Sequence, residues 1–187
     1  ALLDLIKPTT GKVLNNGINV RTSEDWKSFT SAFLDESFLI SYLMPEEYFY
    51  FVGELRNFSK KQVDEFLKQF EDLFNGEILG GKKFIRDLSK GNQKKVGIVA
   101  ALIGDPEVII LDEPFANLDP TTQIRLKKII KTLSQKVGVT VLVSSHDLQD
   151  VTEVSDRIVL LEKGLVIKDI KKTKKTLQDL ESYFTKE

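Results

Sequence analysis

The stretch Asp87–Asp119, DLSKGNQKKVGIVAALIGDPEVIILDEPFANLD, decides the fold of this chain. It contains an apolar run, Val108–Leu111, followed directly by two carboxylates, Asp112 and Glu113. An apolar run of this length between turn residues is typical of a strand buried on both faces of a parallel sheet. Ligands of such sheets collect at the carboxyl ends of the strands, so the two acids are expected at a ligand site.

The two adjacent acids need not share a task. Neighbouring residues of a strand point to opposite sides, so Asp112 can hold a metal while Glu113 faces a reacting water. Two ionised carboxylates at the end of a buried strand are costly unless a metal or a ligand compensates them. This division of labour favours nucleotide hydrolysis.

A second part of the stretch, Leu88–Asn92, precedes a helix predicted over Gln93–Ile103. Ser89 offers a hydroxyl and Gly91 allows close approach to the backbone, and with the free N–H groups of a helix start they can form an anion site. Taken alone, the segment fits an ordinary helix N-cap better.

His146 is the only histidine and follows Thr140–Ser144, which is predicted to be another buried strand. A lone histidine is more often a structural residue than a catalytic one. Here the ends of two neighbouring strands would bring His146 close to Asp112 and Glu113. An imidazole there can donate to a γ-phosphate and help to orient the attacking water.

Composition bounds the class of protein. The chain has 187 residues, of which 41% are hydrophobic and 29% charged, as in an ordinary globular domain. Lys+Arg 27 against Asp+Glu 28 gives no bulk electrostatic case for nucleic acid binding, and the absence of cysteine excludes disulfides and thiolate metal sites. No apolar run approaches the roughly 20 residues of a membrane span, so membrane association would be peripheral.

Periodicity and turn residues predict alternating strands and helices in the second half, which indicates an α/β fold with a parallel sheet and crossover helices. The further elements predicted are a helix over Ala1–Ile6 that lacks its beginning, a hairpin of Lys12–Leu14 and Ile18–Val20, a helix over Glu24–Leu34, a strand over Phe38–Leu43, a helical insertion from Tyr48 to Ile85, helices over Thr121–Lys136 and Asp147–Val154, strands over Arg157–Leu161 and Leu165–Lys168, a lysine-rich linker over Lys168–Lys175, and a helix over Thr176–Phe184.

One near-match to a phosphate loop is rejected. Gly76–Lys83 has four residues between two glycines and then a lysine, but Lys83 stands where Ser or Thr should bind Mg²⁺. The preceding residues are predicted to be helical where a strand is required. The 187 residues therefore contain no convincing phosphate loop.

With these motifs in order, the chain resembles the nucleotide-binding subunit of ABC transporters, most closely the branch that serves ABC-2 type exporters. The corresponding segments are Leu88–Asn92 for the signature motif, with Lys90 and Asn92 in place of the usual Gly and Gln; Val108–Glu113 for Walker B; Asn117–Asp119 for the D-loop; and His146 for the switch histidine. Leu2–Gly11 is similar to the helix and turn that follow Walker A. The resemblance thus places Walker A upstream of Ala1.

The resemblance implies a P-loop NTPase-like parallel sheet core over 1–47 and 86–187, N-terminally truncated, with a helical subdomain over 48–85. The implied cofactors are ATP and Mg²⁺, with Asp112 as the metal ligand and Glu113 and His146 as catalytic residues. The nucleotide-binding residues would be Ser89, Gly91, Asn92, Asp119 and Glu46, the last standing in for the Q-loop glutamine after Phe38–Leu43. Ser89 and Gly91 would act on the nucleotide of a partner subunit.

The resemblance also implies partners: a transmembrane permease subunit and a second ATPase subunit, in a homodimer or heterodimer packed head to tail, with no nucleic acid. The protein would be cytoplasmic and peripheral on the inner face of the cell membrane. This chain alone is expected to be inactive without Walker A. Two alternatives stay open: a soluble ABC ATPase of translation or DNA repair, and a non-enzymatic regulatory module.

Overall fold

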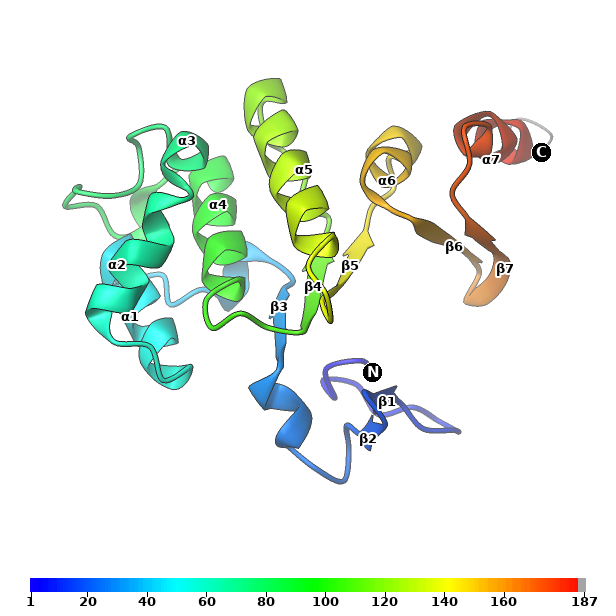
Figure 1. Cartoon of the computed structure of the whole chain (residues 1–187), viewed down its shortest axis with the longest axis horizontal. Helices are drawn as coiled ribbons and strands as arrows, with labels where there is room; N and C mark the ends of the chain where they lie inside the picture. The colour runs from blue at the N-terminus through cyan, green and yellow to red at the C-terminus, as the bar shows by residue number, and fades with distance from the viewer. Residues whose placement is uncertain (185–187) are drawn as a thin grey trace.

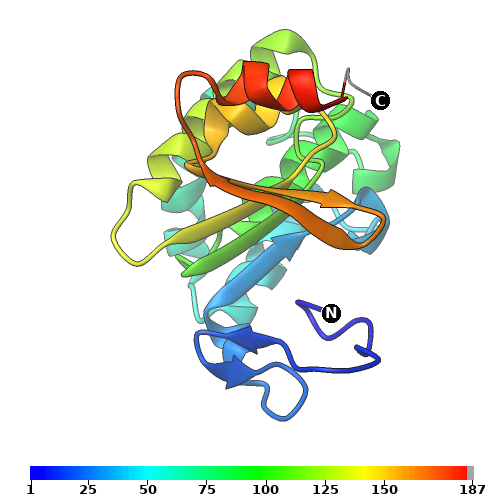
Figure 2. The same cartoon turned by 90° about the vertical axis from the view of Figure 1, so that its right-hand side faces the viewer.

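A three-stranded parallel sheet forms the centre of the computed structural model, which describes residues 1–184. The strands are β3 (Thr30–Phe33), β4 (Val108–Asp112) and β5 (Thr140–Ser144), and they lie side by side in this order (Figures 1 and 2). The register pairs Phe33 with Leu111, and Asp112 with Ser144. All three strands therefore end at the same edge of the sheet.

Two helices connect the strands and pack on the sheet: α4 (Lys90–Ala101) and α5 (Pro120–Ser134). Ser89 caps α4 by accepting a hydrogen bond from the backbone N–H of Asn92, at 3.2 Å. Asp119 caps α5 in the same way from Thr122, at 3.0 Å. Both caps satisfy N–H groups that a helix start leaves without intrahelical partners.

The predicted helical insertion is present as three helices beside α4 (Figure 1): α1 (Pro45–Leu55), α2 (Lys60–Lys68) and α3 (Glu71–Phe74). Their aromatic residues form one cluster, in which the ring centroids of Phe49 and Phe74 are 5.9 Å apart. This cluster continues into the core under the sheet, through Phe33 and Leu111. A separate subdomain over 48–85 stays a prediction.

Two antiparallel hairpins complete the strands. The first pairs β1 (Leu14–Asn15) with β2 (Ile18–Asn19), and the second pairs β6 (Arg157–Glu162) with β7 (Leu165–Lys171). Both turn at residues with positive φ, Asn16–Gly17 at 46° and 80° and Lys163–Gly164 at 48° and 82°. Such values suit tight hairpin turns, and both predicted hairpins are confirmed.

The C-terminal helices are also present: α6 (Leu148–Val154) and α7 (Thr176–Phe184), which lie against each other beyond β5 (Figure 1). The predicted lysine-rich linker is shorter than expected, because β7 extends to Lys171. None of the helices among residues 1–184 is long and apolar enough to cross a membrane.

Three predictions for the first 43 residues are wrong. Residues 1–6 form turns, since so short a segment cannot repay helix nucleation and its Leu5 and Ile6 side chains are 63% and 70% exposed. The expected helix over Glu24–Leu34 is a single 3₁₀ turn, η1 (Asp25–Ser28), followed by β3. Pairing with β4 overrides the helical spacing of the aromatic residues in that segment.

The expected strand over Phe38–Leu43 is likewise absent. A 3₁₀ turn, η2 (Glu36–Phe38), and further turns lie there, and the Phe38 side chain is exposed. The strand β5 is present as predicted but is not buried. Thr140, Leu142 and Ser144 lie on one face of the strand and are exposed, while Val141 and Val143 on the other face are half-buried.

Candidate functional site

Glu113 and His146 meet at the carboxyl edge of the parallel sheet. The Oε1 atom of Glu113 accepts a hydrogen bond from the backbone N–H of His146 and lies against its ring Nδ1, both at 2.9 Å. The two residues follow β4 and β5, whose register sets Asp112 beside Ser144. The predicted proximity of His146 to Glu113 is confirmed.

The turn after β4 directs the Glu113 side chain. Glu113 has φ 44°, in the left-handed region that glutamate seldom adopts. Its N–H donates to both the carbonyl oxygen and the hydroxyl of Ser144, at 3.2 Å each. Unfavourable backbone conformations of this kind persist where surrounding contacts hold them, and they concentrate at functional sites.

The Glu113 contact changes the acid–base behaviour of His146. The hydrogen bond with Glu113, and then its negative charge, raises the pKa of the imidazole above its ordinary value. The His146 side chain is nevertheless 82% exposed, against 37% for Glu113. Electrostatic contributions are weak in water, so this pair needs a covering surface to act strongly on a substrate.

Asp112 lies beside this pair, and its carboxylate accepts a hydrogen bond from the Ser144 hydroxyl. Its second oxygen has capacity for a water-bound cation. No cluster of three or more potential ligands occurs among the described residues. Mg²⁺ usually takes one or two carboxylates together with waters and phosphates, so this donor set suits it.

The first turn of α4 packs against the segment that leads into α5. A Cβ on Gly91 would lie 3.6 Å from the carbonyl oxygen of Asn117, an ordinary contact. Hydrogen bonds from Thr122 lower the pKa of Asp119, and Ser89 and Asn92 face each other across the helix cap. The N-cap predicted at Ser89 is confirmed, Asp119 is observed as the N-cap of α5, and the nucleotide contacts of both stay predictions.

Glu46 lies elsewhere, on the first turn of α1, where its carboxylate accepts a hydrogen bond from the backbone N–H of Gly80. No contact described within residues 1–184 joins it to the pair of Glu113 and His146. The strand that it was expected to follow is not there. The acidic residues that follow β3 of this sheet are Asp35 and Glu36.

Lys94 is a residue of this edge that sequence reasoning missed. Its ammonium donates to the carbonyl oxygens of Glu113 and Ala116, both at 2.9 Å, and lies 3.8 Å from Glu36 Oε1. One signal was available: Lys94 and Lys95 directly precede the apolar second half of α4, Val96–Ala101. Nothing in the sequence reveals which atoms they reach.

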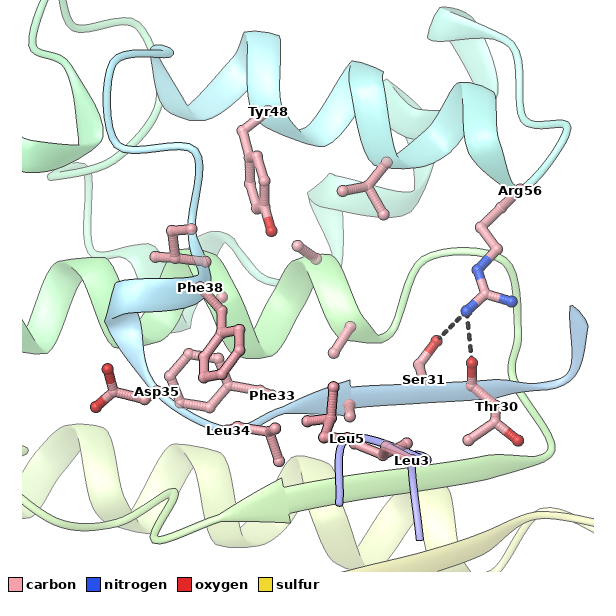
Figure 3. A pocket seen from close by; sticks show the side chains of 16 residues that line it. Leu3, Leu5, Thr30, Ser31, Phe33, Leu34, Asp35, Phe38, Tyr48 and Arg56 are labelled. Atoms are coloured by element: carbon pink, nitrogen blue, oxygen red, sulfur yellow. Dashed lines mark hydrogen bonds between the residues drawn. The ribbon is translucent and has the colours of Figure 1, made fainter. Parts of the chain in front are cut away.

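A separate cavity of about 330 Å³ lies between β3, α1 and α4 (Figure 3). The Arg56 guanidinium closes one end by donating to Thr30 O and Ser31 Oγ, at 2.6 and 2.8 Å, and burial lowers its pKa. Burial also raises the pKa of Tyr48, which points into the cavity. The walls contain no acid–base pair comparable to Glu113 and His146.

Comparisons with known proteins agree with this geometry. The family model described as "ABC transporter" matches residues 1–116. The energy-coupling factor transporter ATP-binding protein EcfA2 of Staphylococcus epidermidis is 31% identical over 174 residues, covering 87% of this chain and 59% of that protein. The molybdate/tungstate import ATP-binding protein WtpC of Pyrococcus abyssi is 29% identical over 164 residues, covering 87% and 47%.

Among solved structures, the dimeric post-hydrolysis state of the ATP-binding cassette MJ0796, bound to ADP and Pi, has a TM-score of 0.74 at 24% identity. The match covers 89% of this chain and 75% of that chain. The expected P-loop NTPase-like α/β fold is confirmed. The chain spans only about three fifths or less of the two curated relatives described above.

Proposed function

Because the chain belongs to the ABC transporter family of ATP-binding proteins, we propose that it is the part of an ATP-binding subunit that hydrolyses MgATP to power transport. The contact between Glu113 and His146 at the carboxyl edge of the sheet carries this proposal. A carboxylate can polarise the attacking water, and an imidazole beside it can donate to the γ-phosphate. Their mutual hydrogen bond orients both groups before a substrate arrives.

Asp112 is the residue that would hold Mg²⁺, through water. The ion, when bound, neutralises charge on the phosphate oxygens. Ser144 orients the Asp112 carboxylate and also accepts from the Glu113 N–H. One serine hydroxyl therefore joins the metal-binding and the water-polarising carboxylates.

The exposure of His146 supports a second subunit that covers this edge head to tail. In this arrangement Ser89, Gly91 and Asn92, at the start of α4, contact the nucleotide of the partner, while Asp119 lies at the subunit interface. The free N–H groups and the dipole of a helix start favour phosphate. The nucleotide is then enclosed by residues of both subunits, which excludes water and strengthens the electrostatic contacts.

We infer that the 187 residues alone do not turn over ATP. The near-match Gly76–Lys83 follows the helix α3 instead of a strand, and Ile78 within it is 2% exposed and part of the core. Residues 1–184 thus offer the carboxylates and the histidine but no phosphate cradle. Titration calorimetry with MgATP tests this, since tight binding by the 187-residue chain contradicts it.

Glu36 has more structural support than Glu46 as the acidic residue that stands in for the Q-loop glutamine near the γ-phosphate. It follows β3 at the shared edge and lies 3.8 Å from Lys94, which itself contacts the Glu113 turn.

We further propose that the helices α1–α3 contact a membrane permease and that the subunit is peripheral on the cytoplasmic face. Export as the direction of transport remains a prediction from the ABC-2 resemblance.

Glu113→Gln tests the hydrolytic role. In a form of the protein with a phosphate loop ahead of Ala1, called the extended form below, this change should lower turnover at least about 100-fold and keep MgATP binding. Phosphate release and nucleotide binding are the measurements. Glu107→Gln is the matched control, because Glu107 lies at the opposite end of β4, near Asn16. Unchanged phosphate release in Glu113→Gln would mean that Glu113 does not act on the water.

A further inference from the structure

Lys94 lies in the interior, in a helix that buries every residue from Gln93 to Ala101. Its side chain is 7% exposed. An ammonium at such a position is costly unless polar groups replace its water. The carbonyl oxygens of Glu113 and Ala116 accept two of its three N–H groups, and the Glu36 carboxylate lies within ion-pair distance of it.

Both carbonyl groups belong to the turn that carries Glu113. This turn contains two residues in the left-handed region, Glu113 with φ 44° and Asn117 with φ 62°. A carbonyl oxygen that is fixed by an ammonium fixes the peptide plane on its side of the residue. The Ser144 contacts fix the N–H side of the same residue. Glu113 is therefore held from both sides in a conformation that glutamate rarely adopts alone.

We propose that Lys94 is a positioning residue, whose ammonium holds the Glu113–Ala116 turn so that the Glu113 carboxylate points at His146. The consequence for ATP hydrolysis rests on the function proposed above. The positioning itself does not, because it concerns contacts within this chain. Among residues 1–184, the Lys94 ammonium contacts the carbonyl oxygens of Glu113 and Ala116 and the Glu36 carboxylate, and it acts on Glu113 through the backbone.

The neighbouring Lys95 provides a comparison. Its side chain is 6% exposed, and it reaches Glu77 at 3.6 Å, away from the Glu113 turn. The two lysines share a helix, a degree of burial and a charge. They differ in the groups that they contact: Lys94 binds the Glu113 turn and Lys95 binds Glu77. Lys95→Met is therefore the matched control for Lys94→Met.

The test uses the 187-residue chain and the imidazole titration of its single histidine, followed by NMR. Loss of the Lys94 charge and loss of its positioning role predict opposite changes of the His146 pKa in Lys94→Met. Loss of a nearby positive charge alone would raise the His146 pKa, because a cation disfavours imidazolium. Loss of positioning removes the Glu113 hydrogen bond and lowers the His146 pKa toward the ordinary imidazole value.

We expect Lys94→Met to lower the His146 pKa and Lys95→Met to leave it unchanged. A folded Lys94→Met chain whose His146 pKa is unchanged or higher overturns the proposal, as does an equal decrease in both variants. If Lys94→Met does not fold, Lys94→Gln is measured in its place. Its amide is shorter than the lysine side chain and can still donate, so we expect a smaller decrease of the His146 pKa, and an unchanged or higher pKa overturns the proposal.

Turnover of the extended form supplies a second, independent readout. Lys94→Met should lower kcat by at least about 10-fold and leave KM for MgATP within about 2-fold, because the nucleotide contacts are intact. If Lys94→Met lowers the His146 pKa but the unmodified extended form shows no ATPase activity, the proposed function is wrong and the positioning role of Lys94 stands.

Discussion

At the scale of single residues, the unusual conformation of Glu113 joins the ends of two strands. Its carboxylate accepts from the backbone N–H of His146 and lies against the ring, and its own N–H is bound by Ser144. Glu113 is thus bound at its carboxylate by the backbone and ring of His146, and at its N–H by Ser144, which is more than closing a turn requires. The contacts orient one carboxylate and one imidazole toward the same open edge.

A pH-dependent stability follows from the raised pKa of His146. The folded state favours the imidazolium, so the contribution is full below the pKa of the unfolded chain and is lost as the pH rises through the raised folded pKa. The groups that favour the charged ring are Glu113 first, then Asp147 and Asp150. His146→Asn should therefore lower the free energy of unfolding more at about pH 6 than at about pH 8.

Urea unfolding at both pH values measures this difference. In a Glu113→Gln background the pH dependence of the His146→Asn effect should shrink, since the main cause of the raised pKa is gone. An equal loss of stability at both pH values would contradict the coupling of the two side chains.

At the scale of elements, the close packing of α4 on the sheet positions Lys94. Gly97 of α4 lies over the ring of Phe33 in β3, where a Cβ would come within 2.3 Å of Cε2. Phe33 is 3% exposed, and its ring would have to shift to admit a Cβ at this position. A glycine in mid-helix is thus required by the distance between the helix and the strand.

Gly97→Ala should lower the free energy of unfolding by about 1–2 kcal/mol, because the overpacking cost of about 1–3 kcal/mol exceeds the gain in helix propensity of up to about 1 kcal/mol. Gly91→Ala on the same helix is the control. Its nearest atoms would be 3.6 Å away, so its stability should stay equal or rise. Urea denaturation compares the two, and a stabilised Gly97→Ala would show that α4 does not pack this closely.

The elements after Asp87 could be predicted from the sequence because their signals are local. Apolar runs are bounded by turn residues, and helix starts carry Ser89 and Asp119 as caps. The error at Glu24–Leu34 has a physical cause. Trp26, Phe29 and Phe33 recur at helical spacing, and the partner that makes Thr30–Phe33 a strand is β4, which is distant in the chain.

The contacts of the candidate site also include some that the sequence predicts and some that it does not. The meeting of Glu113 and His146 was predictable, because the carboxyl ends of adjacent parallel strands meet by geometry. The contacts of Lys94 and Glu36 were not, since they depend on how far α4 stands from the sheet and on where β3 ends.

At the scale of the whole molecule, the stretch Asp87–Asp119 has two functional ends that face different nucleotides in the proposed dimer. In the proposed dimer, Asp112 and Glu113 would act on the nucleotide of their own subunit, and Ser89 and Gly91 on that of the partner. The exposure of His146 fits an edge that is completed only by assembly. A symmetric head-to-tail dimer contains two such composite sites.

Phosphate release by mixed dimers of the extended form tests this central claim most directly. One copy carries Ser89→Arg and the other Glu113→Gln, each with its own affinity tag, and each variant alone should be inactive. In the mixed dimer one composite site keeps both Ser89 and Glu113, so about half of the unmodified rate should return. If the mixed dimer is as inactive as either variant alone, Ser89 and Glu113 act on the same nucleotide and the account of two half-sites is wrong.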